Sequence, residues 1–194
     1  MRASTITRKT KETDITVRLA LDGTGEGTIS TGIGFFDHML SALRTHAGLD
    51  LTVQAAGDLE VDCHHTIEDV GIVLGRALGE ALGDRAGIAR YGSSQIPMDE
   101  ALGVCILDIS GRPFLRFDCA FSGERVGALD TAMAEEFFRA LAMNAGITLH
   151  LAVPYGNNDH HKLEALFKAL AHALRQAVQP AGDGRPLSTK GVLA

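Results

Sequence analysis

The sequence is poor in cysteine and has none of the spacings that pair or cluster thiols. Its 194 residues include three cysteines, Cys63, Cys105 and Cys119, without a C-x-x-C pair. An odd number of scattered cysteines indicates reduced thiols in the cytosol rather than a disulfide framework. Cys63 lies beside two histidines, but a small buried filler is its expected role.

Positive charge and long apolar runs are also scarce. Lys and Arg total 18 against 24 for Asp and Glu, a net charge of −6, which argues against a nucleic-acid partner. No apolar run approaches membrane-spanning length, and the N-terminal "MRASTITRKTKETD" lacks the apolar core of a secretory signal. With 45% hydrophobic and 22% charged residues, the composition predicts an acidic, globular, cytoplasmic α/β protein without a membrane partner.

The first half of the chain predicts strand, strand, helix, strand, strand, helix. Alternation in residues 15–29 predicts a hairpin about Asp22-Gly23, and residues 32–48 have helical periodicity that stops at Gly48. Residues 49–62 predict two short strands with a turn near Gly57-Asp58. An amphipathic helix should follow, from His64 to about Gly83.

The same order recurs in the second half. Residues 101–121 predict two strands about Ser110-Gly111, followed by a helix, a strand and a closing helix over residues 130–146, 147–153 and 157–178. We therefore expect a first half at 1–88, a second half at 89–180 and a C-terminal tail at 181–194.

An H-H-x-x-E motif marks both halves. His64, His65 and Glu68 recur as His160, His161 and Glu164 at a constant offset (160 − 64 = 96), and "AGLDL" at 47–51 matches "AGITL" at 145–149 at an offset of 98. The second offset places His38 opposite Glu136 on the preceding helices (136 − 38 = 98). Each half thus has a helix with one ligand-type residue, then a helix that opens with H-H-x-x-E.

A duplicated motif of this kind favours a metal site. Residues three or four apart share one helical face, although a single copy would be better explained as a solvated, capped helix start. Imidazole and carboxylate ligands suit manganese, iron, nickel or zinc, and four protein ligands on an octahedral ion leave two positions for water or substrate. Adjacent histidines point roughly 100° apart on a helix, so one of each pair could serve an ion shared with a neighbouring subunit.

Six segments carry a resemblance to a known family: "GIGFFDHML", "DCHHTIEDVG", "DISGRP", "EEFFRAL", "NNDHHKLEALFKA" and "LSTKGVL". In this order, over nearly the whole chain, they closely resemble imidazoleglycerol-phosphate dehydratases of histidine biosynthesis. The resemblance implies an α/β fold with two pseudo-repeated ββαββα-type halves, and a four-helix bundle packed between two four-stranded sheets. It also implies trimers that assemble into a homo-oligomer of twenty-four subunits, with active sites at subunit interfaces.

The resemblance further implies two Mn²⁺ per active site. The ligands it gives are His38, His64, His65, Glu68, His160, His161 and Glu164. Two positions depart from the family pattern. Glu136 stands where many members have histidine, and a carboxylate there can still ligate manganese; Ala42 stands where some relatives have a glutamine that contacts phosphate.

The reaction implied is dehydration of imidazole glycerol phosphate to imidazole acetol phosphate. It requires cleavage of a C–H bond of ordinary acidity and loss of hydroxide. A ring held through both nitrogens by two cations could become an imidazolate, whose electrons would expel the hydroxyl through a diazafulvene-like intermediate. The resemblance makes Glu12 the acid or base, against the alternative of a solvated strand-edge charge; Asp99 and Glu100 are weaker candidates.

The phosphate of such a substrate needs local cations in an acidic protein. The residues that the resemblance gives for it are His46, Arg90, Arg112, Lys168, Ser188 and Lys190, with the tail ordered over the bound phosphate. The alternatives are a hairpin arginine at Arg112, a helix ion pair between Lys168 and Glu164, and a frayed tail. His150 and His172 match no ligand position and are expected to be structural.

Two other functions remain open at this point. A helix-bundle di-metal protein for iron storage or oxidation would use Glu-x-x-His, the reverse order, and would need no phosphate-binding tail. A non-catalytic assembly protein would use metal only to join subunits. Turnover of imidazole glycerol phosphate distinguishes all three.

Overall fold

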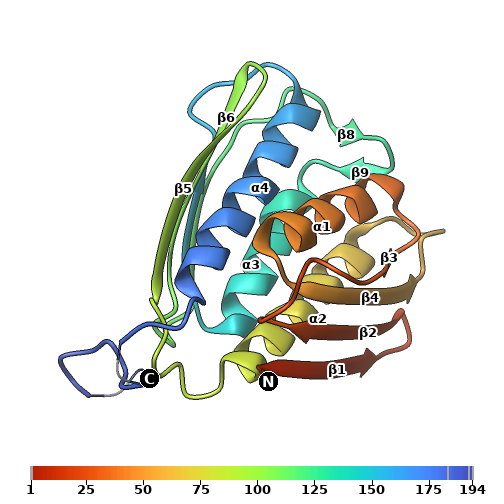
Figure 1. Ribbon diagram of the computed structural model, residues 1–194. Coiled ribbons are helices and arrows are strands. Elements are labelled where there is room, and N and C mark those ends of the chain that lie inside the picture. The colour runs from red at the N-terminus through yellow and green to blue at the C-terminus, as the bar shows by residue number, and fades with distance from the viewer. Residues whose placement is uncertain (1, 183, 192, 194) are drawn as a thin grey trace.

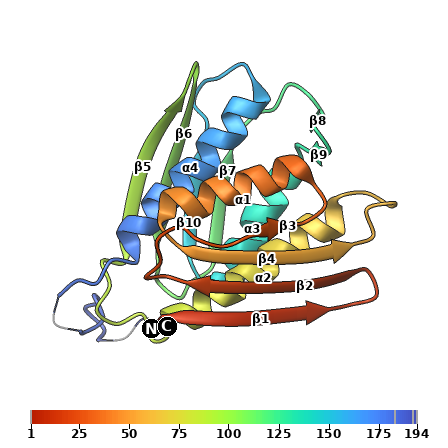
Figure 2. The ribbon, with the colours of Figure 1, turned by 45° about the vertical axis from the view of Figure 1, so that its right-hand side comes forward.

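Two four-stranded sheets enclose four helices (Figures 1 and 2). The computed structural model describes residues 2–182, 184–191 and 193. The helices are α1 (Gly34–Ala47), α2 (His64–Leu82), α3 (Met133–Ala145) and α4 (Asp159–Ala177). The predicted fold class is confirmed: an α/β protein with two pseudo-repeated halves and its helices packed between the sheets.

Each half contributes one sheet. The first has the order β1-β2-β4-β3, formed by β1 (Ala3–Lys9), β2 (Thr13–Ala20), β4 (Asp50–Gly57) and β3 (Ile29–Ser30). The second has the order β5-β6-β10-β7, formed by β5 (Tyr91–Met98), β6 (Ala101–Asp108), β10 (Thr148–Ala152) and β7 (Phe114–Asp118). A small hairpin of β8 (Arg125–Val126) and β9 (Leu129–Asp130) is added to the second half.

The strand pairing repeats residue by residue. In each sheet the first three strands pair antiparallel, and the fourth pairs parallel to the third. Ala3 pairs with Ala20 just as Tyr91 pairs with Asp108, so these two strands repeat at an offset of 88 (91 − 3 = 108 − 20 = 88). On the next strand of each sheet, Asp50 pairs with Ala20 and Thr148 pairs with Asp108, at an offset of 98 (148 − 50 = 98).

Some expected strands are wrong. The hairpin about Asp22-Gly23 does not form, because β2 pairs with β1 and β4, whereas β3 lies beyond β4 and runs parallel to it. The carboxylate of Asp50 accepts the backbone N–H groups of Thr24 and Glu26, at 2.8 and 3.0 Å, and holds the connection over the end of β4. The strand expected after Gly57 is a turn, in which the Val61 N–H donates to the Asp58 carbonyl at 2.8 Å.

Two edge strands were also missing from the expectation. In both β1 and β5 alternate residues are exposed, and several inward positions are small or polar, so neither has the apolar alternation that predicts a strand. The first half therefore runs strand, strand, strand, helix, strand, helix, and the second follows the same order with the β8–β9 hairpin added before α3. Each half has the two helices and four sheet strands that the family resemblance implies.

The helices form as predicted and pair across the two halves. α1 and α3 end at Gly48 and Gly146, whose φ values of 70° and 67° lie in the left-handed region that favours glycine. α1 of the first half packs on α4 of the second, and α3 of the second half packs on α2 of the first. We call these contacts the α1–α4 seam and the α2–α3 seam.

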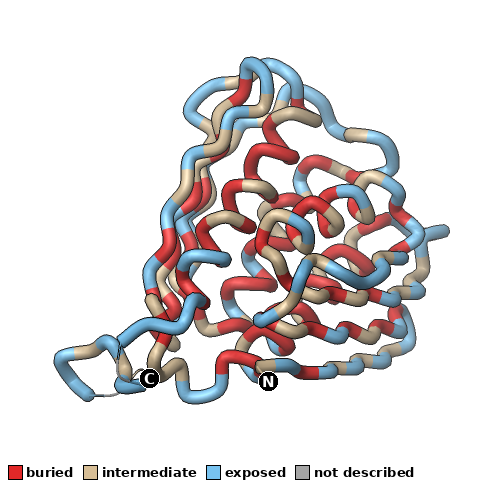
Figure 3. Tube along the Cα trace, viewed as in Figure 1, coloured by how far each residue is buried: buried red, intermediate tan, exposed pale blue. Residues whose placement is uncertain are grey.

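The two seams have different packing. On α2, a Cβ added at Gly71 would lie 2.8 Å from the Phe137 carbonyl oxygen, and one at Gly75 would lie 2.7 Å from that of Leu141. The equivalent positions of α4 are Phe167 and Ala171 (71 + 96 = 167; 75 + 96 = 171). Phe167 packs on Phe137 at the centre, and buried positions cover the inner faces of helices and sheets (Figure 3).

Within the described residues, no helix has both the length and the apolar character needed to cross a membrane.

Candidate metal and substrate site

Three predicted metal ligands converge on the α1–α4 seam. His38 comes from α1, and His160 and Glu164 come from the first turns of α4. The Nε2 atoms of the two histidines lie 3.4 and 3.2 Å from Glu164 Oε2, and one donor atom from each residue lies within 4.8 Å of the others. We call these residues the His38 cluster. Asn158 caps α4 by accepting the His160 N–H at 2.9 Å, which fixes the helix start that carries the ligands.

Glu164 is held as an anion beside a lysine. Its side chain is only 9% exposed, and Lys168 Nζ lies 2.6 Å from Oε1. Burial opposes ionisation, but the hydrogen bond and charge of Lys168, with the hydrogen bonds of His160 and His38, outweigh it and lower the pKa of Glu164. One carboxylate oxygen is thus occupied by Lys168, and the other faces the two imidazoles.

The seam continues with further basic groups. The rings of His46 on α1 and His172 on α4 lie 5.3 Å apart. Burial, and then the charges of His172 and Lys168, lower the pKa of His46. Since His38 meets Glu164 and His46 meets His172, the two helices run in the same direction. His172, expected to be structural, lies against a predicted phosphate-binding residue.

The α2–α3 seam carries the equivalent residues further apart. His64 Nε2 lies 3.6 Å from Glu68 Oε2, and Glu136 Oε2 lies 3.6 Å from Arg139 Nε on the same helix. Within the described ranges, three metal-type side chains converge only at the His38 cluster. His64 also lines a cavity of about 530 Å³, bounded by Met133 and the β8–β9 hairpin.

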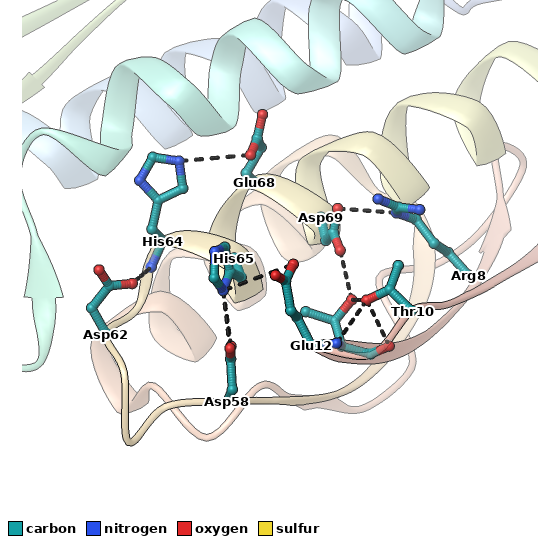
Figure 4. Close-up of polar contacts among 10 residues, drawn as sticks. Arg8, Thr10, Glu12, Asp58, Asp62, His64, His65, Glu68 and Asp69 are labelled. Atoms are coloured by element: carbon teal, nitrogen blue, oxygen red, sulfur yellow. Dashed lines mark hydrogen bonds and ion pairs between the residues drawn. The ribbon is translucent and has the colours of Figure 1, made fainter.

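The second histidine of each motif is paired with carboxylates from turns and connections of its own half. His65 Nδ1 lies 3.0 Å from Asp58 and 4.0 Å from Glu12 (Figure 4). His161 Nδ1 lies 2.6 Å from Glu100, and its Nε2 lies 3.6 Å from Asp99. The hydrogen bond to Asp58 raises the pKa of His65, and that to Glu100 raises the pKa of His161.

The turn that carries Glu12 is anchored to α2. Asp69, buried on α2, accepts hydrogen bonds from Arg8 Nε at 3.0 Å and from Thr13 Oγ1 at 2.6 Å (Figure 4). The Glu12 N–H donates to Thr10 Oγ1 at 3.0 Å, and the side chain of Glu12 stays 55% exposed. The backbone of this turn is therefore fixed, while its carboxylate remains open to solvent.

Sequence reasoning missed two carboxylates of this region, Asp58 and Asp69. The acidic run between Gly57 and Cys63 was a signal for Asp58, because it lies directly before the histidine pair. Asp69 has the sequence context of an ordinary helical aspartate, and its contacts with the β1–β2 turn come only from the tertiary fold.

The other predicted phosphate-binding residues surround a separate cavity of about 970 Å³. Its lining comes from Arg90, Tyr91, Arg112 and the described tail residues 185–191 and 193, which include Ser188 and Lys190. Arg90 is buried; it donates to both oxygens of Asp108, at 2.7 and 3.0 Å, and to the Leu187 carbonyl. These bonds place the tail over the cavity, which we call the tail cavity.

The tail cavity and the His38 cluster lie at opposite ends of α4. The Arg90 N–H donates to the carbonyl of Ala177, the last residue of that helix, whereas Glu164 lies in its second turn. The thirteen-residue difference (177 − 164 = 13) corresponds to roughly 20 Å along a helix. The predicted phosphate-binding residues therefore form two groups: His46 and Lys168 on the α1–α4 seam, and Arg90, Arg112, Ser188 and Lys190 at the tail cavity.

The fold and site define a class of protein: a duplicated α/β fold whose histidine–carboxylate cluster is built from both halves. Comparison with known proteins gives the family. A family model described as "Imidazoleglycerol-phosphate dehydratase" matches residues 31–174. The chain is 58% identical over 188 residues to the Alkaliphilus metalliredigens imidazoleglycerol-phosphate dehydratase, covering 96% of each chain. It is also 58% identical over 193 residues to that of Methanococcoides burtonii, covering 100% of each.

Solved structures agree. The crystal structure of imidazoleglycerol-phosphate dehydratase from Staphylococcus aureus has a TM-score of 0.84 at 41% identity, covering 92% of this chain and 99% of the other. The crystal structure of the Pyrococcus furiosus protein in complex with (S)-C348 has a TM-score of 0.83 at 38% identity, covering 97% of this chain and 100% of the other. The chain belongs to the imidazoleglycerol-phosphate dehydratase family. Its resemblance to that family is confirmed, as is the prediction that it is an enzyme of the hydro-lyase class.

Proposed function

We propose that this enzyme converts imidazole glycerol phosphate to imidazole acetol phosphate in histidine biosynthesis, with two Mn²⁺ per active site. The observation that carries the proposal is the convergence of His38, His160 and Glu164 from opposite halves of a chain that shares 58% identity with dehydratases of this name. Two imidazoles and one carboxylate, without a thiolate, suit manganese, and other divalent metals are possible occupants.

The spacing of the donor atoms fits such an ion. Around an octahedral cation with bonds of about 2.1 Å, neighbouring donor atoms lie about 3 Å apart. The two imidazole nitrogens of the His38 cluster lie 3.4 and 3.2 Å from the carboxylate oxygen. The remaining ligands would be His64, His65, Glu68, Glu136 and His161. A bound cation would supply positive charge that stabilises an anionic imidazole ring of the substrate.

The chain's own residues would bind the substrate and move the protons. Glu12 is suited to proton transfer because its carboxylate is exposed, lies 4.0 Å from His65 and stands on an anchored turn. Arg112, Ser188 and Lys190 in the tail cavity would bind the phosphate, whereas Arg90 would orient the tail through Asp108 and Leu187. Lys168 would supply positive charge on the ring side, and His46, whose pKa is lowered by burial, would contact the substrate as a neutral hydrogen-bonding group.

A complete site then requires more than one chain. The ring and phosphate of the substrate are joined by only three carbons, which cannot span the roughly 20 Å of α4 between the His38 cluster and the tail cavity. A cluster in one subunit would work with the tail cavity of another. Exposed Tyr91, Ile106 and Phe114 on the outer face of the second sheet offer apolar surface for subunit contact. Such surface supports association of subunits, and we propose that the assembly is a cytoplasmic homo-oligomer of trimers with twenty-four subunits.

Turnover of imidazole glycerol phosphate by purified protein tests the proposal. Chelator-stripped protein should be inactive, and added Mn²⁺ should restore release of the acetol phosphate. Absence of turnover by manganese-loaded protein would contradict the function, and iron oxidation by the same sample would favour the di-metal storage alternative. Truncation after Leu187 should raise KM, because it removes Ser188 and Lys190 from the tail cavity.

A further inference from the structure

Two turns of the molecule are equivalent by the sheet register. Glu12 ends the β1–β2 turn and Glu100 ends the β5–β6 turn, each directly before the second strand of its sheet. The offset of 88 that relates these strands also relates the two glutamates (100 − 12 = 88). The duplicated fold therefore places one carboxylate at the same point beside each H-H-x-x-E motif.

The two equivalent carboxylates are used differently. Glu100 Oε2 accepts from His161 Nδ1 at 2.6 Å, and its Oε1 accepts the backbone N–H groups of Asn157 and Asn158 at 3.0 and 2.7 Å. Glu12 Oε2 stays 4.0 Å from His65 Nδ1. Glu100 is fixed by three hydrogen bonds, whereas the side chain of Glu12 has no contact of comparable length among the described residues.

A neighbouring segment explains the difference. In the first half, Asp58 lies in the connection between β4 and α2 and accepts a hydrogen bond from His65 Nδ1 at 3.0 Å. The corresponding connection of the second half, residues 153–158, reads "VPYGNN" and contains no carboxylate. His161 therefore has no equivalent of Asp58, and Glu100 accepts the hydrogen bond from its Nδ1 instead.

A carboxylate at Nδ1 decides which imidazole nitrogen can bind a metal. Neutral imidazole has one N–H and one lone pair, and an ionised carboxylate can only accept. The proton is thereby fixed on Nδ1, and Nε2 presents its lone pair outward.

We propose that Glu100 is the positioning residue that presents Nε2 of His161 to a metal ion, and that Asp58 does the same for His65, which leaves Glu12 available for proton transfer. This inference rests on the proposed function, in which both histidines are ligands and Glu12 is the acid or base. The duplicated turn carboxylate thus has two roles: one copy holds a ligand and the other serves the reaction.

Mn²⁺ titration of chelator-stripped protein tests this, with free Mn²⁺ counted by electron paramagnetic resonance. In Glu100→Gln, the side-chain carbonyl can still accept backbone N–H groups, but an amide N–H facing Nδ1 favours the wrong tautomer. Affinity should fall on the order of 10- to 100-fold, and Asp58→Asn should behave alike. Glu100→Asp should recover part of the loss. Glu12→Gln should keep the wild-type affinity while kcat falls.

Two controls separate positioning from charge and from folding. Asp118→Asn removes one charge from the same half at an exposed site, where the carboxylate pairs with Arg116. It should change the Mn²⁺ affinity by about threefold or less. Equal weakening by Asp118→Asn and Glu100→Gln would overturn the proposal, as would wild-type affinity in Glu100→Gln or equal weakening in Glu12→Gln. Thermal unfolding of the metal-free variants should show that they fold.

The outcomes also distinguish this inference from the function on which it rests. Wild-type protein that binds Mn²⁺ without dehydrating the substrate would contradict the proposed function and leave the affinity comparison valid. Turnover by wild-type protein, together with unaltered Mn²⁺ binding in Glu100→Gln, would contradict the inference alone. Wild-type protein that binds no Mn²⁺ would contradict both.

Discussion

The α1–α4 and α2–α3 seams are two versions of one arrangement. On the first, His38, His160 and Glu164 bring their donor atoms within 4.8 Å of one another. On the second, Glu136 is drawn to Arg139 on its own helix, and His64 faces Glu68 at 3.6 Å. The helices follow the same plan in both, so the side chains decide whether the ligands gather.

Single cations show how the two seams diverged. Lys168, beside Glu164, corresponds to Ile72 on α2 (168 − 96 = 72), and Arg139, beside Glu136, corresponds to Ser41 on α1 (139 − 98 = 41). On the α1–α4 seam the cation takes one oxygen of the carboxylate and leaves the other for the histidines. On the α2–α3 seam the cation, Arg139, pairs with the carboxylate of Glu136. A duplicated fold can thus keep two sites and give each its own electrostatics.

The strongest test of the comparison mixes two inactive variants. Glu164→Gln removes a ligand of the His38 cluster and Arg112→Ala removes a cation of the tail cavity, and each alone should lose on the order of 100-fold or more in kcat/KM. Mixed oligomers, prepared by exchange of metal-stripped subunits, should regain about a quarter of the wild-type rate, since half of each part is intact. A mixture no more active than its components would show that cluster and cavity serve one site within a chain.

Stability should separate the two motif glutamates. Glu164→Gln leaves the mostly buried Lys168 without its carboxylate partner and should lower the free energy of unfolding by about 2–3 kcal/mol. Glu68 is half-buried, and His64 is its one ion-pair partner among the described residues, so Glu68→Gln should leave the unfolding midpoint in urea nearly unchanged. The measurement is urea unfolding of metal-free protein. Equal losses in the two variants would contradict the difference described between the seams.

Packing provides a third test. Gly75→Ala should cost about 1–3 kcal/mol, because the new Cβ would lie 2.7 Å from the Leu141 carbonyl oxygen. The reverse change on the other seam, Ala171→Gly, introduces no clash and should cost about 1 kcal/mol through helix propensity. Thermal unfolding of both variants gives the comparison. A neutral Gly75→Ala would mean that α2 and α3 can separate at no cost.

The smallest effect is expected at Arg139. Arg139→Gln frees the carboxylate of Glu136 from an exposed ion pair and should strengthen binding of the more weakly held Mn²⁺ by about threefold. Titration of stripped protein measures it, with Arg116→Gln on the outer surface as the control. Weaker binding in Arg139→Gln would show that the guanidinium supports the site rather than competes for it.

The helices could be predicted from the sequence because local periodicity indicates them, and the duplication could be predicted because equivalent residues lie at constant offsets. Gly48 and Gly146 end their helices as expected, and the H-H-x-x-E motifs open α2 and α4 or lie in their first turn. The strands were harder to predict from the sequence. β1 and β5 are edge strands without a continuous apolar face, and β3 has only two residues.

The residues of the candidate site could be proposed from the sequence, whereas the contacts between them could not. The offsets paired His38 with Glu136 as equivalents, but only the cross-half packing shows that His38 meets Glu164. The partnership of Glu100 with His161 spans 61 residues and depends on a turn reaching a helix start. No periodicity encodes such a contact. The separation of Arg90 from the His38 cluster likewise follows from the length of α4 and its place in the fold.

The pairing of helices across halves also bears on ancestry. A half-length chain ending near residue 88 would contain α1 and α2 but neither α3 nor α4, so it could form neither seam by itself. Two copies of it could form both, and the two seams would then be identical. In a single chain, position 136 and position 38 can hold different residues, and Glu12 and Glu100 can make different contacts. Because each seam joins the two halves, separately expressed chains of residues 1–88 and 89–194 should associate with each other.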